Sequence, residues 1–251
     1  MSQPRPRIAC VSYLNSRPLV EGLDQDPSIE LFYDVPARLI HRMTTGLADV
    51  ALLPVIDLLR INNPQIIESS GIGCDGATLT VRLFSRSPLE ETRRVAVDPD
   101  SHTSVVLSKI IFQKRFGLIP DYVALKDANQ SPRETLLLIG DKVICDQPRD
   151  MPFQLDLGQA WKELTGLPFV FAIWAARENF VLGEVPQKLL DAKTLGLSHI
   201  DAIIRDHALP RGWPADIARQ YLTQFLNYNI GPKQLQAIAL FHQFARDIDA
   251  V

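Results

Sequence analysis

The chain has 251 residues, of which 46% are hydrophobic, so it is long enough to bury a sizeable core without disulfides or metals. Its formal net charge is −3, and the charged residues are spread along the chain. No basic stripe indicates nucleic-acid binding, and no polybasic tract indicates an anionic membrane.

The N-terminal residues are polar, and the apolar stretch that follows has about five residues, fewer than the roughly 7–15 of a signal-peptide core. No apolar run approaches the length of a membrane span. Cys10, Cys74 and Cys145 are far apart, which excludes a CxxC metal motif and disfavours a structural disulfide. We therefore expect a cytoplasmic protein with no nucleic-acid or membrane partner.

Strands and helices alternate in the first part of the chain. Short apolar runs predict buried strands at residues 7–11, 31–35 and 49–53. A helix that begins at Arg17, with Pro18 in its first turn, follows the first of these strands. A second helix at 36–43 ends at Gly46, which is typical of a C-terminal cap. Two strand–helix–strand crossovers of this size predict a parallel sheet with helices on both faces.

A second strand–turn–helix unit is predicted in the middle of the chain. A strand at 94–97 leads through a polar turn to a helix at 105–115, and another buried strand is expected at 135–139. From about residue 186 onward, the apolar periodicity is mostly helical.

Two extended apolar runs lie between these units. β-Branched and apolar residues alternate along 78–85. This run is too long for a simple parallel core strand, so we interpret it as a connector between two lobes. The run 167–174 is able to return the chain to the first lobe. We therefore predict a two-lobed α/β fold like that of type-2 periplasmic binding proteins, with mostly parallel sheets flanked by helices and two interlobe crossings. The predicted first lobe is 1–80 and 176–251, and the second is 81–175.

Polar turns follow four of the predicted strands. Ligands of open α/β sheets bind beyond the carboxyl ends of the strands, so these turns are expected to meet in a cleft between the lobes. The candidate ligand-binding residues in the turns are Ser12, Asn15, Ser16, Ser101, Thr103, Ser104 and Asp141.

Each candidate also has a structural interpretation. The hydroxyls and N–H groups of the turn that begins at Ser101 favour a carboxylate or phosphate, but serine is also a common helix cap. Asn15 offers a donor and an acceptor, and it can equally serve the turn that it occupies. Asp141 follows a glycine after a buried strand, which is also typical of an ordinary turn.

The motifs G-x-x-x-x-G-K, G-x-S-x-G and H-E-x-x-H, which mark common phosphate-binding, nucleophilic and zinc sites, are absent from the sequence. We therefore expect neither a cofactor nor a metal. His102 has no sequence neighbour that marks it as a general base. Asp156 and Glu163 flank Trp161 at a spacing that identifies no acid–base pair, so we interpret both as helix-surface charges.

Several motifs occur together along the chain. They are VSYLNSRPL at 11–19, Asp75-Gly76, Leu83-Phe84-Ser85, Thr103-Ser104-Val105, Ile139-Gly140-Asp141, Asp156-Leu157-Gly158 and WKELTGLPFVFAIW at 161–174. In combination they resemble the chorismate dehydratases of the futalosine route to menaquinone, over nearly the whole chain. The last block is the most distinctive.

The resemblance implies a cofactor-free lyase that removes water from chorismate to give 3-[(1-carboxyvinyl)oxy]benzoate between the lobes. It implies a catalytic role for Asn15 and a substrate-carboxylate role for the hydroxyls of the 101–104 turn. Thr80 stands where a serine is usual and keeps the hydroxyl. Residues 98–100 and His102 depart from the serine-rich, arginine-containing pattern expected at this turn.

The implied reaction needs few protein groups, because loss of the ring C3 proton and C4 hydroxyl creates an aromatic ring. We expect Asn15 to hydrogen-bond the leaving hydroxyl or the adjacent carboxylate, and a substrate carboxylate to remove the proton. Two alternatives stay open. One is a small-anion solute-binding or sensor protein of the same fold. The other is the sister dihydroxynaphthoate synthase, whose opening motif differs from Tyr-Leu-Asn.

Overall fold

The chain folds around two five-stranded sheets. The computed structural model describes residues 5–98, 101–128 and 134–250, so Pro99 and Asp100 of the predicted polar turn lie outside the described residues. The first sheet, in the order β2-β1-β3-β10-β4, is built from β1 (Arg7–Val11), β2 (Glu30–Asp34), β3 (Val50–Pro54), β4 (Gln65–Cys74) and β10 (Phe169–Ala176). The second, in the order β7-β6-β8-β5-β9, is built from β5 (Val81–Ser85), β6 (Arg94–Val97), β7 (Asp121–Ala124), β8 (Glu134–Ile139) and β9 (Phe153–Asp156).

Both sheets are mixed rather than mostly parallel. In each of them, two of the four strand pairings are parallel and two are antiparallel. The antiparallel pairings all involve β10 or β5, which enter from the opposite half of the chain instead of through a strand–helix–strand crossover. The two sheets therefore share one strand plan, as the predicted two-lobed α/β fold requires.

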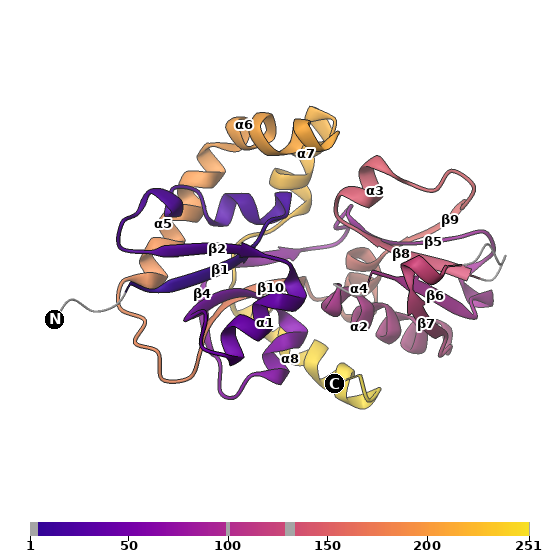
Figure 1. The fold of residues 1–251 in the computed structure, drawn as a ribbon. Helices are drawn as coiled ribbons and strands as arrows, with labels where there is room; N and C mark the ends of the chain where they lie inside the picture. Colours follow the sequence, from indigo (N-terminus) through magenta and orange to yellow (C-terminus); the bar gives the residue numbers. More distant parts are fainter. Residues whose placement is uncertain (1–4, 99–100, 129–133, 251) are drawn as a thin grey trace.

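Helices cover both sheets (Figure 1). The α-helices are α1 (Pro36–Thr44), α2 (His102–Ile111), α3 (Asp141–Cys145), α4 (Leu157–Thr165), α5 (Val185–Ser198), α6 (Ile200–Ile203), α7 (Ala215–Gln220) and α8 (Pro232–Asp247). Short 3₁₀ and π segments are η1 (Leu14–Leu19), η2 (Leu23–Gln25), η3 (Val55–Arg60), η4 (Leu89–Glu91), η5 (Phe112–Phe116), η6 (Leu125–Asp127), η7 (Ile204–Ala208), η8 (Leu209–Arg211) and η9 (Tyr221–Phe225). No helix in the described part of the chain is both long and apolar enough to cross a bilayer.

The helix predicted to begin at Arg17 is instead the short 3₁₀-helix η1, with Pro18 inside it. Proline lacks the N–H that an α-helix interior needs, and its ring clashes with the carbonyl four residues earlier. The turn after β1 therefore stays compact and keeps Asn15 close to the end of the strand.

The predicted connector at 78–85 is only partly a connector, because residues 81–85 form β5 of the second sheet. The return run was correctly expected to reach the first sheet, where β10 pairs with β3 and β4. We propose that the two sheets define the two lobes. The chain then returns to the first lobe before Phe169, where β10 begins, so the second lobe ends earlier than the predicted boundary at residue 175.

The C-terminal helix α8 lies between the two halves in Figure 1 and contacts α2, β10 and η3. Its Phe241 packs edge-on against Trp161 of α4, with ring centroids 6.1 Å apart. The Trp161 indole N–H donates to the carbonyl of Pro168 at 2.9 Å. The distinctive 161–174 block thus forms the buried junction of α4, β10 and α8.

Candidate functional site

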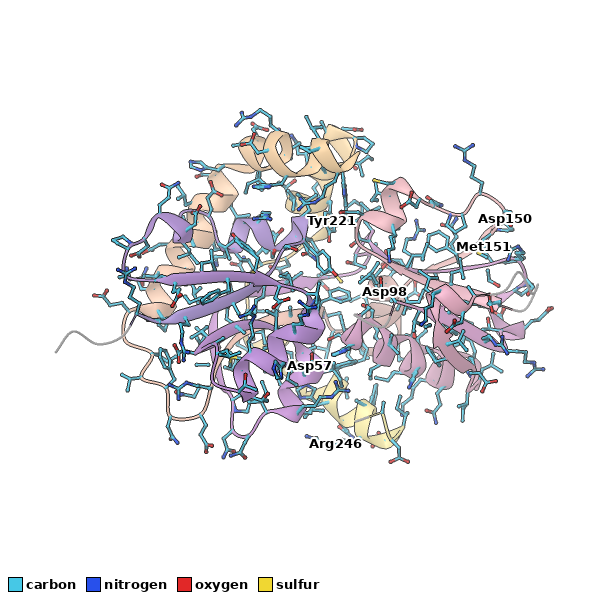
Figure 2. All side chains as sticks on the ribbon, viewed as in Figure 1. Asp57, Asp98, Asp150, Met151, Tyr221 and Arg246 are labelled. Carbon is cyan, nitrogen blue, oxygen red and sulfur yellow. The ribbon has the colours of Figure 1, made fainter. Side chains whose placement is uncertain are left out.

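A cavity of about 280 Å³ lies between the two sheets. Figure 2 shows Asp57, Asp98 and Tyr221 in this middle region of the molecule. Of the residues predicted from the sequence, six line the cavity, namely Asn15, Thr80, Ser101, Thr103, Ser104 and Asp141. The strand-end turns therefore converge as the sheet topology requires.

Ser12 and Ser16 are not among the lining residues. The Ser16 side chain is fully buried, and its hydroxyl lies 2.7 Å from the Val11 carbonyl and 2.8 Å from the Tyr13 carbonyl. The Ser12 carbonyl accepts a hydrogen bond from Arg211 at 3.1 Å. Both serines hold the shape of the turn that presents Asn15.

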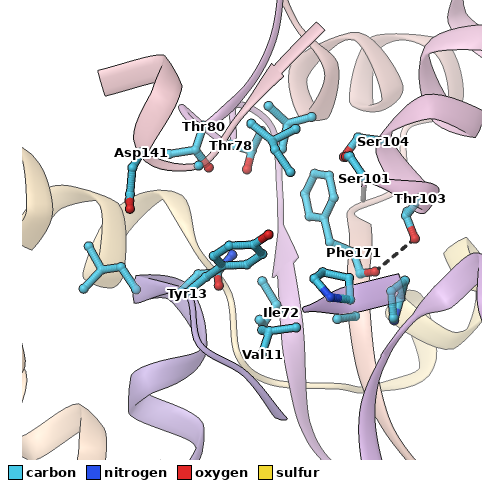
Figure 3. Close-up of a pocket in the computed structure, with 18 of the residues that line it drawn as sticks. Val11, Tyr13, Ile72, Thr78, Thr80, Ser101, Thr103, Ser104, Asp141 and Phe171 are labelled. Atoms are coloured by element: carbon cyan, nitrogen blue, oxygen red, sulfur yellow. Dashed lines mark hydrogen bonds between the residues drawn. The ribbon is translucent and has the colours of Figure 1, made fainter. Parts of the chain in front are cut away.

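The start of α2 forms one end of the cavity (Figure 3). Ser101 is the N-cap residue, yet its side chain makes no capping hydrogen bond, so the helix-cap interpretation does not account for its hydroxyl. With the described residues, the hydroxyls of Ser101 and Ser104 form no hydrogen bond, although both residues are 6% exposed. Thr103 Oγ1 donates to the Phe171 carbonyl at 3.4 Å. This end offers hydroxyls and helix N–H groups, which suit a carboxylate.

The opposite end is built around the buried phenol of Tyr221. Thr80 Oγ1 donates to the Tyr221 hydroxyl oxygen at 2.9 Å. Burial raises the pKa of Tyr221 to about 12, although hydrogen bonds from Thr80 and Asn15 oppose that rise. The Asn15 Oδ1 atom is buried and has no hydrogen-bond partner among the residues that the structure describes. An acceptor and a protonated phenol thus sit side by side at this end.

Asp141 also lines the cavity, where it is already engaged by side chains of the C-terminal region. Trp213 Nε1 donates to Asp141 Oδ1 at 2.6 Å, and Arg211 Nε lies 3.9 Å from Oδ2. Figure 3 places Asp141 and Thr80 away from the α2 hydroxyls. Asp141 therefore joins α3 to the segment after η8 in addition to facing the cavity.

Charged groups at the cavity are paired. Lys142 Nζ lies 2.5 Å from Asp98 Oδ2. His102 Nδ1 lies 3.0 Å from each carboxylate oxygen of Asp57, and Asp57 is fully buried. Asp57 ends the polar turn at 54–57, one of the four turns that the sequence predicts at the cleft. Sequence reasoning missed Tyr221 and Trp213, because no local motif links them to the turns that they contact.

Within the described residues, no group of three or more His, Cys, Asp or Glu side chains is placed to hold a metal ion. Cys10, Cys74 and Cys145 are free thiols, and burial raises the pKa of Cys10 to about 12. The thiols are thus not arranged as ligands, and the polar groups of the cavity are hydroxyls, an amide and paired charges.

A family model described as menaquinone biosynthesis matches residues 6–247. The chain belongs to the menaquinone biosynthesis family. Two curated relatives of this chain are named chorismate dehydratase, which confirms the predicted resemblance. One, from Thermus thermophilus, is 27% identical over 250 residues, covering 92% of this chain and 90% of the relative. The other, from Campylobacter jejuni, is 24% identical over 229 residues, covering 91% of this chain and 88% of the relative.

Solved structures confirm the predicted periplasmic-binding-protein-like fold. A protein from Archaeoglobus fulgidus has a TM-score of 0.77 at 17% identity and covers 100% of both chains. The periplasmic aliphatic sulphonate binding protein SsuA from Escherichia coli has a TM-score of 0.70 at 15% identity, covering 99% of this chain and 88% of SsuA. The named relatives indicate an enzyme of menaquinone biosynthesis, and the solved structures show that the chain shares their fold.

Proposed function

We propose that this protein is a cofactor-free, cytoplasmic chorismate dehydratase. The observation that carries the proposal is the buried Asn15 Oδ1, which no described residue engages and which lies in the same cavity as the α2 hydroxyls. Chorismate carries two carboxylates and a ring hydroxyl, so it matches a cavity with carboxylate donors at one end and an acceptor at the other. The volume of about 280 Å³ lies just below the roughly 300–1,000 Å³ of small-molecule sites.

In the proposed reaction, Asn15 Oδ1 accepts a hydrogen bond from the C4 hydroxyl and fixes its position. The Tyr221 hydroxyl, which its raised pKa keeps protonated, donates to the same oxygen as it leaves. A substrate carboxylate takes the C3 proton, the C–H electrons enter the ring, and the C4–O bond breaks. The carboxylate then passes its proton to the departing hydroxide, which leaves as water. The α2 hydroxyls hold the other carboxylate throughout.

The proposal is tested by incubating the purified protein with chorismate and following the products by mass spectrometry. We expect a product lighter than chorismate by one water, with the fragmentation of 3-[(1-carboxyvinyl)oxy]benzoate and at a rate proportional to protein concentration. Chorismate that is bound but unchanged would indicate a solute-binding or sensor protein. Chorismate that is neither bound nor changed would favour the sister dihydroxynaphthoate synthase.

A further inference from the structure

His102 is the first residue of α2 and lines the cavity, and its ring is fixed by a carboxylate from another part of the chain. Asp57 in η3, 45 residues earlier, places both carboxylate oxygens 3.0 Å from Nδ1. Arg60 Nη1 also donates to Asp57 Oδ1, at 3.0 Å. Asp57 is fully buried, so this Arg60–Asp57–His102 chain forms a rigid support behind the helix start.

The pairing assigns the hydrogen on the imidazole. An ionised carboxylate only accepts hydrogen bonds, so Nδ1 carries a hydrogen toward Asp57. Nε2 has no hydrogen-bond partner among the described residues, and it is the nitrogen left for a ligand in the cavity. A neutral ring offers Nε2 as an acceptor, whereas a protonated ring offers an N–H donor and a positive charge.

An anionic ligand meets little other free positive charge in this cavity. Lys142, the other cationic residue of the lining, is paired with Asp98 at 2.5 Å, and Arg60 is held by Asp57. Asp57 alone balances Arg60, so protonation of His102 leaves the cluster of these three residues with a net positive charge.

Helix α8, which also packs against α2 and η3, carries His242 and Arg246. His242 is committed to the Val55 carbonyl at 2.7 Å, and burial and the charge of Arg246 lower the pKa of His242, which favours the neutral ring. Asp141, the remaining charged residue of the lining, is bonded to Trp213. His102 is therefore the lining residue whose protonation changes the charge met by a carboxylate at the start of α2.

We propose that His102 is the proton-dependent carboxylate-binding group of the site. In its protonated form, Nε2–H donates to one chorismate carboxylate beside the hydroxyls of Ser101 and Ser104, while Asp57 stabilises the imidazolium through Nδ1. The inference rests on the proposed function, since it takes chorismate as the ligand. Because the two binding equilibria are reciprocal, chorismate binding takes up a proton at His102.

The test compares kcat and KM for chorismate between about pH 6 and 9 in the wild type, His102→Gln and His102→Arg. We expect the wild-type KM to rise with pH. His102→Gln has a KM about tenfold to a hundredfold higher at the low-pH end and no pH dependence, with kcat changed far less. His102→Arg keeps a permanent charge, so its KM stays low and independent of pH. His41→Gln, at an exposed histidine outside the cavity, behaves as the wild type.

Titration calorimetry in two buffers of different ionisation enthalpy measures the proton directly. We expect the wild type to take up a proton with chorismate and His102→Gln to take up none. A wild-type KM that is flat with pH, or proton uptake retained in His102→Gln, overturns the role of His102 while turnover still supports the proposed function. Proton-linked binding without turnover keeps the carboxylate site and rejects dehydration.

Discussion

The buried Tyr221 side chain has a proposed chemical role in the cavity, and its burial also makes the stability of the fold depend on pH in alkali. Its ring stacks on Trp213 with centroids 5.1 Å apart, and its hydroxyl meets Thr80 and Asn15 at the cavity. Burial disfavours the phenolate, which is why the pKa rises to about 12. The hydroxyl therefore remains a donor under any condition in which the enzyme would operate.

The raised pKa of Tyr221 predicts a loss of stability in alkali. Between the ordinary value of 10.0 and about 12, the folded protein keeps a proton that the unfolded chain loses. This contribution to stability is thus fully present below pH 10 and declines as the pH rises, by about 2–3 kcal/mol in total. Tyr221→Phe lacks the titrating group, so its free energy of unfolding, measured by urea denaturation, should fall less steeply than the wild type over this range. An equally steep fall of the free energy of unfolding with pH in both proteins would contradict the raised pKa of Tyr221.

The site residues that sequence predicted well are those placed by strand ends. Asn15 and Ser101 follow β1 and β6 closely, so sheet topology alone brings them to one cavity. The hydrogen-bond partners of His102 and Thr80 in the same cavity were not predictable. Asp57 is 45 residues from His102, and Tyr221 is 141 residues from Thr80. Ser16 is predicted to bind the substrate, because the sequence does not reveal that its hydroxyl donates to the Val11 carbonyl instead.

At the scale of elements, Asp156 ties α4 to the first crossing between the sheets. Its carboxylate accepts N–H bonds from Gly158 at 3.0 Å and Gln159 at 3.2 Å, which caps the helix. It also accepts from the backbone N–H of Thr78 at 3.0 Å and of Leu79 at 2.8 Å. The interpretation of Asp156 as a helix-surface charge is therefore wrong, since one side chain fixes two segments beside the cavity.

Removing this carboxylate should loosen the crossing. We expect Asp156→Ala to lower the free energy of unfolding by about 2 kcal/mol or more, because four backbone donors lose their acceptor. Glu163→Ala is the matched control on the same helix. Glu163 is exposed and pairs with Arg115 at 2.7 Å, an interaction worth at most about 1 kcal/mol. Urea denaturation that finds both variants equally stable would contradict the role of Asp156.

Sequence patterns predicted the central strands better than the edges. β3 and the core of β10 are continuous apolar runs, which buried strands require. β4 was not predicted, because its register shifts around residues 68–70 and interrupts the apolar pattern with Glu68, Ser69 and Ser70. β7 lies at the edge of its sheet and has no fully buried residue, so it lacks the signal of a core strand.

At the scale of the whole molecule, the cavity exists only because the two halves meet. Asn15 follows a strand of the first sheet, whereas Ser101 and its neighbours follow a strand of the second. Contacts such as Trp213 with Asp141 and Asp57 with His102 close the space from both sides. The order of predicted elements indicated two lobes, but local patterns carry no information on which side chains touch across them.

The most direct test of this account is kcat/KM for chorismate in Asn15→Ala, compared with the wild type and with Asn62→Ala. Asn62 is an exposed asparagine that bonds Glu178 outside the cavity, so its removal should leave the rate unchanged. We expect Asn15→Ala to lower kcat/KM by about a hundredfold to a thousandfold, because the leaving hydroxyl loses its positioned polar partner. Wild-type kcat/KM in Asn15→Ala would contradict the assignment of this cavity as the place where chorismate loses water.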